Sequence, residues 1–363
     1  MSKRIRHIDI AAGVMILWMI IYHAICYAWS FDLRDYWWMD DLSLLPAGLH
    51  AIINNEGRIE TLNPCVLFPY LSFFMPWFFY KSGQFFKKKS INELWIKDSS
   101  KLLCTFVVWS AIGYIFYLVF NFLQHTLTFR SATFSIVRGL FLTGKIPINE
   151  PLWFLLTLFG VRAIANITLP NKEDKWSWLK ALGLAAIGYM IAYLAYRVNY
   201  RLLPYWIANG ASGYAFFVLG YGLREYESKW WIIMPSLCIY LLCCVVGFPM
   251  VDMMFNKLIA GNYLLWMPVA LCGIVTFNTV CRFISKYISI KPLELVGQYA
   301  MPIYVMHILV VLTIQFVIYY FKIEILYSYM LWLFLAGYVL FLPLSCRYIP
   351  IRCHNYEQKG GRL

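Results

Sequence analysis

The side chains best suited to chemistry are two histidines that lie in strongly apolar surroundings, His23 and His307. An imidazole can accept a proton near neutral pH, so it can act as a general base toward a hydroxyl group. Counting the helical rise from the predicted inner end of each segment puts both at a depth of about 20 Å. If their helices are neighbours, the rings could share one site. The alternative for each is a hydrogen bond between membrane helices.

Two further polar residues share helical faces with these histidines. Asp9 lies on the face of His23, about 21 Å away along the axis, so the two could line opposite ends of one polar passage. Tyr304 precedes His307 by one helical turn, so their side chains fall on one face. Each is a candidate because a polar group is costly inside a membrane.

Lysines interrupt and then close the second apolar segment. Lys81 lies within it, where the alternative to a functional role is a side chain that reaches back to the membrane surface. The run Lys87, Lys88 and Lys89 follows at its predicted inner end. These three residues either anchor the topology or capture an anionic ligand such as a nucleotide phosphate.

The elements that position these residues must be membrane helices. The chain has 363 residues, of which 61% are hydrophobic and only 13% charged, which excludes a soluble enzyme, a disordered protein and a secreted disulfide scaffold. Its ten cysteines form no recognisable framework. We predict an all-α, polytopic bundle of about ten transmembrane helices. The predicted spans are roughly 8–28, 65–86, 101–121, 151–169, 178–197, 206–223, 231–250, 263–281, 294–321 and 326–345. The short apolar stretch 134–144 is expected to be re-entrant or interfacial.

The net charge of +13 is interpreted as an orientation signal. Most Lys and Arg residues between the spans fall on one side, so the positive-inside rule places both termini in the cytoplasm. Because orientation explains the positive charge, we predict no nucleic-acid partner. We expect a multi-pass protein of the inner (cytoplasmic) cell membrane. A single transmembrane domain would cover 1–350, followed by a short cytoplasmic tail, 351–363.

The long loop 29–64 is predicted to lie on the outer side. It combines aromatic rings with carboxylates, including Trp37, Trp38, Asp40 and Asp41. Rings that stack on sugars and acids that accept hydroxyl hydrogens would suit a glycan. An aromatic belt at the bilayer surface is the alternative. No residue pattern suggests a bound metal.

Four segments, in order along the chain, resemble the integral-membrane acyltransferase-3 family. The first runs from Asp9 to His23, and the second is the aromatic run Met75–Gly83, which ends in Ser82-Gly83. The third is Pro151–Leu155, which contains Trp153, and the fourth runs from Gly297 to His307 and contains Tyr304. Together they span most of the chain.

The resemblance implies transfer of an acyl group, usually acetyl, from cytosolic acyl-CoA to a hydroxyl of a cell-surface or lipid-linked glycan. On this basis His23 is the expected base, and Tyr304, Ser82 or a protonated His307 would stabilise the developing oxyanion. Asp9, Lys81, Gly83, Trp153 and the lysine run would belong to the donor site or its pocket. Direct attack and an acyl-enzyme route both stay open, as does the oligomeric state.

One position departs from the family pattern. The family's first helix usually carries a basic residue about eleven positions before its histidine, and here that position is Ala12. Lys81 is predicted at a matching depth, which suggests that it supplies the missing charge.

Two other classes of function use the same features. A transporter or flippase for a glycan intermediate would also need many spans, buried histidines and outer aromatic rings, although we find no internal repeat. A proton-coupled channel or sensor would use the histidines but would leave the aromatic loop and Trp153 without a role.

Overall fold

The computed structural model describes residues 5–28, 69–123, 127–170, 176–198 and 205–321. Contacts divide the chain into two compact units. The first unit comprises Met1–Leu71 and Val280–Ile351, and the second comprises Ser72–Thr279 and Arg352–Leu363. The predicted tenth span, 326–345, and the outer-loop residues Trp37, Trp38, Asp40 and Asp41 lie outside the described residues.

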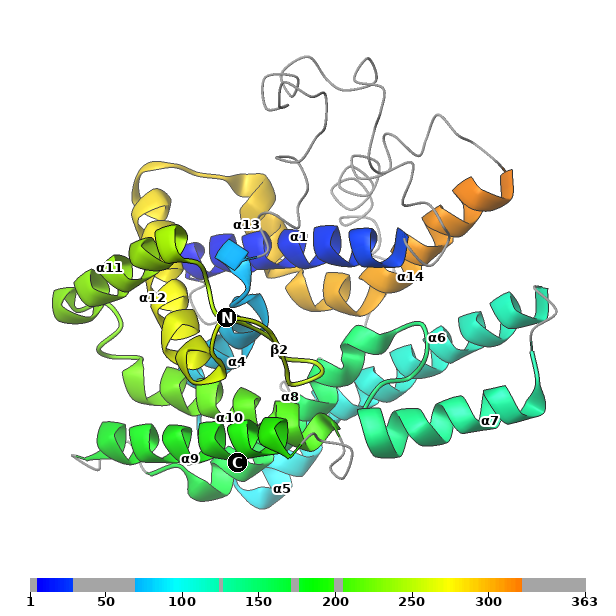
Figure 1. The fold of residues 1–363 in the computed structure, drawn as a ribbon, viewed down its shortest axis with the longest axis horizontal. Coiled ribbons are helices and arrows are strands. Elements are labelled where there is room, and N and C mark those ends of the chain that lie inside the picture. The colour runs from blue at the N-terminus through cyan, green and yellow to red at the C-terminus, as the bar shows by residue number, and fades with distance from the viewer. Residues whose placement is uncertain (1–4, 29–68, 124–126, 171–175, 199–204, 322–363) are drawn as a thin grey trace, which may run out of the picture. The chain divides into compact units, whose positions relative to one another are not determined.

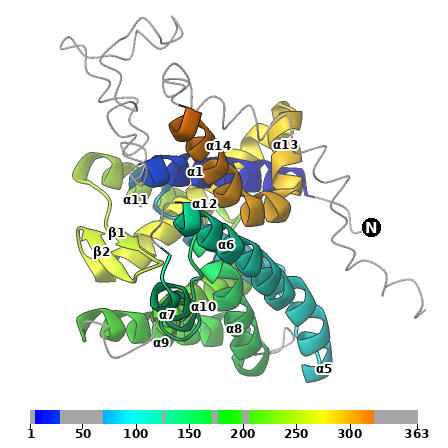
Figure 2. The same cartoon turned by 90° about the vertical axis from the view of Figure 1, so that its right-hand side faces the viewer.

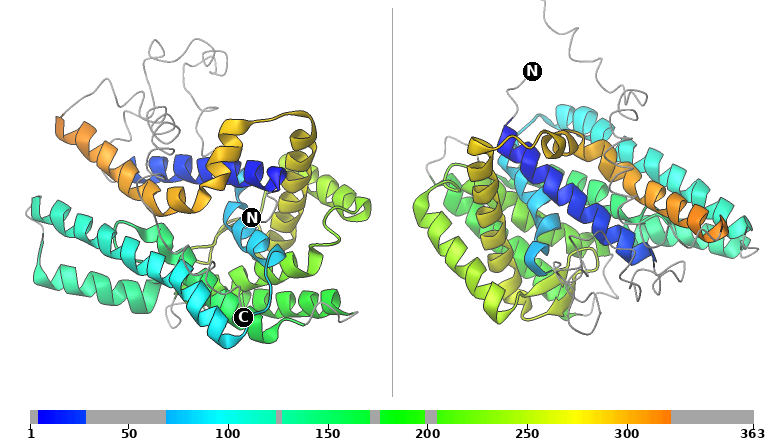
Figure 3. Two further views of the ribbon diagram at one scale, coloured as in Figure 1. Left: turned by 180° about the vertical axis from the view of Figure 1, so that it is seen from behind. Right: turned by 90° about the horizontal axis from the view of Figure 1, so that it is seen from above.

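The first unit is built on α1 (Arg6–Ala28), which packs against α13 (Lys291–Gln298) and α14 (Ala300–Phe321). Figure 1 and Figure 3 show α13 and α14 beside α1. Two glycines allow the backbones of α1 and α13 to approach closely. A Cβ atom at Gly297 would overlap the carbonyl oxygen of Asp9, and one at Gly13 would overlap that of Leu293.

The predicted ninth span, 294–321, is broken rather than continuous, which corrects the expectation of one straight helix. α13 and α14 are bent by 85° at the break around Tyr299. The sequence accounts for the position of the break because Pro302 lies in the first turn of α14. A proline there lacks an N–H that would have no partner within the helix anyway, so it suits a helix start.

The second unit contains the remaining described helices. In chain order they are α4 (Phe74–Gln84), α5 (Ile91–Glu93), η5 (Leu94–Leu103), α6 (Cys104–Leu123), α7 (Phe129–Arg138), η6 (Gly139–Thr143), η7 (Glu150–Leu152), α8 (Trp153–Thr168), α9 (Ser177–Arg197), α10 (Tyr205–Leu223), α11 (Trp230–Val246) and α12 (Tyr263–Tyr287), which continues into the first unit. The short helix η4 (Pro69–Leu71) ends the first segment of the first unit. The stretch expected to be re-entrant or interfacial, 134–144, is helical and falls within α7 and η6.

α10 is the central helix of the second unit and packs against α4, α8 and α9. Its approach to α4 depends on a reciprocal pair of glycines. A Cβ atom at Gly83 of α4 would overlap the backbone of Phe217, and one at Gly220 of α10 would overlap the backbone of Tyr80. Small residues at such crossings are typical of membrane helix pairs, because close backbone contact replaces the hydrophobic drive that lipid does not provide.

The all-α expectation needs one correction, a short antiparallel hairpin. β1 (Met250–Asp252) pairs with β2 (Lys257–Ala260) in the connection between α11 and α12. Asn256 in its turn adopts a positive φ of 49° and donates from Nδ2 to the carbonyl oxygen of Ala192 in α9. Figure 2 shows the hairpin close to α9. A polar side chain of the hairpin thus forms a hydrogen bond with the backbone of a helix.

Among the described residues, four helices are long and apolar enough to cross a membrane, or five if the bent pair α13–α14 counts as one span. Many large apolar side chains lie on the outside, such as Val245 and Val246 of α11, which are 85% and 76% exposed. A water-soluble monomer rarely exposes such surfaces, whereas lipid accommodates them. The chain is therefore a membrane protein with several spanning helices.

Candidate active site

The first unit brings the two predicted histidines into direct contact. Nε2 of His307, on α14, lies 3.1 Å from Nδ1 of His23, on α1, and their ring centroids are 4.9 Å apart. His307 is completely buried and His23 is partly exposed. The two rings therefore form one polar element inside otherwise apolar packing.

Main-chain carbonyl groups determine where the protons of a neutral pair lie. Nδ1 of His307 is 2.6 Å from the carbonyl oxygen of Tyr304, which can only accept, so Nδ1 carries the hydrogen. Nε2 of His307 then holds the lone pair and accepts from Nδ1–H of His23. That hydrogen is shared with the carbonyl oxygen of Met19, 2.9 Å away. The lone pair of His23 consequently lies on Nε2, the atom that can take a proton.

Asp9 and Tyr304 occupy different parts of this unit. The Asp9 carboxylate accepts from Nε2 of Gln298 in α13 over 3.4 Å. The side chain of Tyr304 is buried, and its ring centroid lies 5.9 Å from that of His307. Asp9 therefore belongs to the junction of α1 with α13, whereas Tyr304 lies beside the histidine pair.

An ion pair that sequence reasoning missed joins the same helices. Nε of Arg6 lies 2.7 Å from Oε1 of Glu294, and the guanidinium also donates to the carbonyl oxygens of Ser285 and Ile288. Nothing in the local sequence signals this contact between residues so far apart in the chain. It fixes the beginning of α1 against the segment that leads to His307.

In the second unit, Lys81 is part of a buried charged cluster. Its Nζ lies 3.7 Å from Oε1 of Glu227 and donates to Oε1 of Gln84 over 2.8 Å. The Glu227 carboxylate also accepts from the hydroxyl of Tyr80 and from Nε2 of Gln84. The side chains of Lys81 and Glu227 are only 8% and 2% exposed. Glu227 was not predicted, and only its acidic character next to an apolar segment could have signalled it.

The three lysines of the run are not equivalent. Lys89 forms an ion pair with Asp98 over 2.7 Å, and Arg162 of α8 holds the same carboxylate over 2.9 Å. Asn166 of α8 also exchanges hydrogen bonds with the backbone of Lys89. Lys87 and Lys88 are exposed. The run therefore divides into one anchored residue and two that face outward.

The other predicted pocket residues lie around α4. Ser82 is half-buried, and Gly83 provides the close contact with α10. Trp153 is buried at the start of α8, with its ring centroid 6.5 Å from that of Phe79 in α4. Two of the four resembling segments thus meet in the second unit, and the other two meet in the first through Asp9 and Gly297. Among the described residues, no group of three or more His, Cys, Asp or Glu side chains could hold a metal ion.

Comparison with known proteins assigns the chain to a family. The model of that family, described as an acyltransferase domain, matches residues 5–347. The chain belongs to the acyltransferase-3 family. No match to a curated protein or to a solved structure reaches significance.

Membership in the acyltransferase-3 family makes the chain a membrane acyltransferase. The match includes both histidines, the Lys81–Glu227 cluster and all four of the segments on which the resemblance rested. The match to an acyltransferase family also favours group transfer over the transporter and channel alternatives. Acyl transfer to a hydroxyl group calls for a nearby base, and an imidazole is suited to that role.

Proposed function

We propose that the protein transfers an acyl group, with acetyl as the expected case, from cytosolic acyl-CoA to a hydroxyl group of a cell-surface or lipid-linked glycan. The observation that carries the proposal is the contact between His23 and His307 within a member of the acyltransferase-3 family. The proposal places the protein in the inner membrane, with both termini in the cytoplasm.

The chemistry needs a base, and the lone pair on Nε2 of His23 is suited to that role. As the glycan oxygen attacks the thioester carbonyl carbon, its O–H bond breaks and the proton moves to Nε2. A new C–O bond forms, the C–S bond breaks, and the CoA thiolate takes the proton back from the imidazolium. The products are the O-acyl glycan and free CoA thiol. Proton transfer of this kind typically contributes about 10²–10⁴-fold to the rate.

His307 is a positioning residue in this scheme. Its Nδ1–H is held by the Tyr304 carbonyl, so its Nε2 accepts from Nδ1–H of His23 before and after the proton moves. That contact orients the base and stabilises the imidazolium. It also disfavours His307 as the oxyanion donor, because a second proton on Nε2 would face the hydrogen of His23. Tyr304 and Ser82 remain the proposed oxyanion donors.

For the donor, we propose that the exposed Lys87 and Lys88 attract the phosphates of CoA. Lys89 is already engaged by Asp98. Lys81 is paired with Glu227. If Lys81 replaces the family's basic residue at position 12, as we hypothesise, it does so as a member of this ion pair. For the acceptor, the proposed contacts remain the loop residues Trp37, Trp38, Asp40 and Asp41.

The deciding experiment is mass spectrometry of surface glycans from cells that carry the wild-type gene, no gene, or the His23→Ala variant. We expect wild-type cells to show a mass increase of one acyl group. Cells with the variant should resemble cells without the gene, at unchanged membrane levels of the protein.

His7→Ala is a matched control, because it makes the same change near the start of the same helix. It should retain acylation. Normal acylation with His23→Ala would refute the assignment of the base, and identical glycans with and without the gene would refute the proposed acceptor class.

A further inference from the structure

The connection between α4 and α5, residues 86–90, is non-helical, and we call it the lysine loop. Its first residue, Phe86, is only 1% exposed and packs against Phe217 of α10, with ring centroids 5.2 Å apart. Lys87 and Lys88 follow and are exposed. One end of the loop is therefore fixed inside the second unit, while these two lysines face outward.

Asn166 of α8 fixes the other end of the lysine loop. Its Oδ1 accepts from the backbone N–H of Lys89 over 2.8 Å, and its Nδ2 donates to the carbonyl oxygen of Lys89 over 2.9 Å. A non-helical segment has to find partners for its main-chain groups, and here one side-chain amide provides two of them. Lys87 and Lys88 thus lie between two anchored residues.

The charged groups around the lysine loop have an excess of positive charge. Asp98 is set between Lys89, 2.7 Å away, and Arg162 of α8, 2.9 Å away, so that one carboxylate faces two cations. Glu93, which interacts electrostatically with Lys89, forms an ion pair of its own with Lys97. These groups are three cations and two acids, and the two exposed lysines of the loop add further positive charge. An anion would therefore be attracted to the loop.

We propose, on the basis of the acyl-CoA donor proposed above, that Asn166 is a positioning residue that holds Lys87 and Lys88 in place for the phosphate groups of the donor. Ammonium groups bind phosphate as point charges. Long lysine side chains lose much conformational freedom when they bind, so a loop that is fixed in advance lowers the cost of binding. The topology predicted from the sequence puts this loop on the cytoplasmic side, where the donor is expected.

Titration of the purified full-length protein with CoA at low salt tests the proposal. We expect Asn166→Ala to weaken CoA binding about fivefold, because the loop then has to be ordered when the ligand binds. Replacing both lysines, Lys87→Gln with Lys88→Gln, should weaken it at least as much, and this double variant should fold normally because both side chains are exposed. Adding Asn166→Ala to the double variant should cause little further loss, because Asn166 acts through the lysines.

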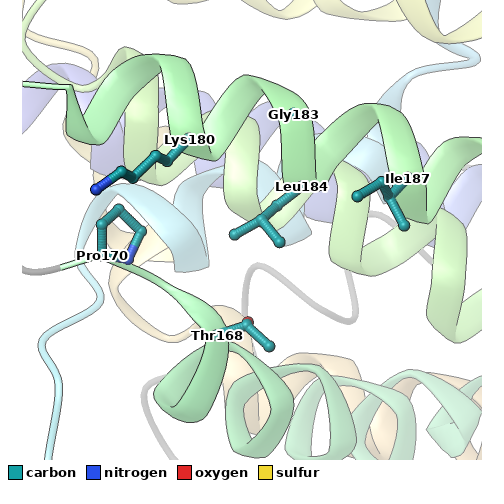
Figure 4. A pocket seen from close by; sticks show the side chains of 6 residues that line it. All are labelled: Thr168, Pro170, Lys180, Gly183, Leu184 and Ile187. Atoms are coloured by element: carbon teal, nitrogen blue, oxygen red, sulfur yellow. The ribbon is translucent and has the colours of Figure 1, made fainter.

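Thr168→Ala is the matched control, because it also removes a hydrogen-bonding side chain from the end of α8. Two residues apart on a helix, Thr168 and Asn166 lie on opposite faces. The Thr168 hydroxyl lies 2.7 Å from the hydroxyl of Tyr214 and donates to the carbonyl oxygen of Ile164. Figure 4 shows Thr168 in a groove that it lines together with Leu184 of α9. This variant should bind CoA like the wild type.

Four results would overturn the proposal. Equal CoA binding by Asn166→Ala and the wild type, or additive effects of Asn166→Ala and the double lysine variant, would show that Asn166 does not act through the lysines, while the proposed donor would stand. Unchanged binding by the double lysine variant would do the same, even if Asn166→Ala did not fold. Displacement of CoA by phosphatidylglycerol at equal concentration would assign the lysines to a lipid headgroup. A wild type that does not bind CoA would refute the proposed donor as well.

Discussion

The two units treat their buried polar side chains in opposite ways. In the first unit, His23 and His307 contact each other and main-chain carbonyl groups. In the second unit, Lys81 contacts Glu227, and Asp98 is held between Lys89 and Arg162. The first arrangement consists of groups that can be neutral, whereas the second sets ammonium and guanidinium groups against carboxylates.

This difference leads us to expect that the first cluster takes part in the proposed chemistry and that the second stabilises the fold. A buried ion pair loses much of its stability when one partner changes charge, so it resists any cycle that adds and removes protons. A neutral imidazole pair with one defined lone pair can accept a proton and return it without breaking an existing ion pair. We therefore expect substitutions in the first cluster to affect activity most, and substitutions in the second to affect stability most.

After His23, the largest loss of activity should come from His307. We expect His307→Ala to lower the rate of acyl transfer by about 10–100-fold, as is typical when a residue that orients a functional imidazole is lost. His307→Gln should recover part of the activity, because its amide oxygen can accept from Nδ1–H of His23. Acyl transfer by purified protein, with donor and acceptor varied separately, measures both variants.

A purely structural role for His307 would give a different result. The two variants would then lose folded protein and activity in parallel, and the glutamine would bring no gain in rate per folded molecule. Thermal unfolding of both variants in the same detergent provides that correction.

The second prediction breaks the ion pair of the second unit. Glu227→Gln keeps the shape of the side chain but leaves the charge of Lys81 buried, which we expect to cost about 3–5 kcal/mol of unfolding free energy. Adding Lys81→Met should recover most of this loss, because no unpaired charge then remains. A double-mutant cycle based on unfolding measures the coupling.

A surface pair offers the control for this cycle. Lys97 and Glu93 lie 3.2 Å apart with side chains about half exposed. Glu93→Gln should lower the unfolding free energy far less than Glu227→Gln does, because water screens the pair. If the buried and the exposed pairs gave the same loss, the Lys81–Glu227 contact would not be a structural element.

The sequence predicts most of the described helices of both units, and it allows the histidines to meet only on the condition that their helices are neighbours. The depth estimate assumed a straight span from 294, whereas the bend at Tyr299 means that the helix carrying His307 begins at Ala300. The rings meet because α1 packs against both α13 and α14. Gly297 contacts the backbone of Asp9 near the start of α1, and His307 contacts His23 nearer its end. Pro302 signals where a helix starts, but no local pattern gives the direction of the bend.

Partners that depend on distant segments could not be predicted. Glu227 and Lys81 are far apart in the chain, and a single sequence holds no record of which carboxylate reaches which lysine. The same applies to the hairpin, whose stability depends on Asn256 reaching the backbone of α9. Helical periodicity describes one element at a time, whereas these contacts arise from the packing of several.

The last prediction tests the comparison at a buried cation of the second unit that lies outside the helices. Lys145 is 7% exposed, with its Nζ 3.5 Å from the ring centroid of Phe255. Burial lowers the pKa of Lys145 from its ordinary 10.5 to about 8; Glu150 and Asp252 oppose this shift and Arg138 adds to it. Below pH 8 both the folded and unfolded states carry the proton, and the folded state bears the full cost of burying the charge. Between pH 8 and 10.5 only the unfolded state keeps it, so this contribution to stability rises with pH.

Lys145→Met should therefore be more stable than the wild type at pH 7, and its advantage should shrink as the pH rises toward 10.5. Melting temperatures of both proteins across this range measure the difference; a constant difference would mean that the charge of Lys145 is as well compensated as those in the ion pairs.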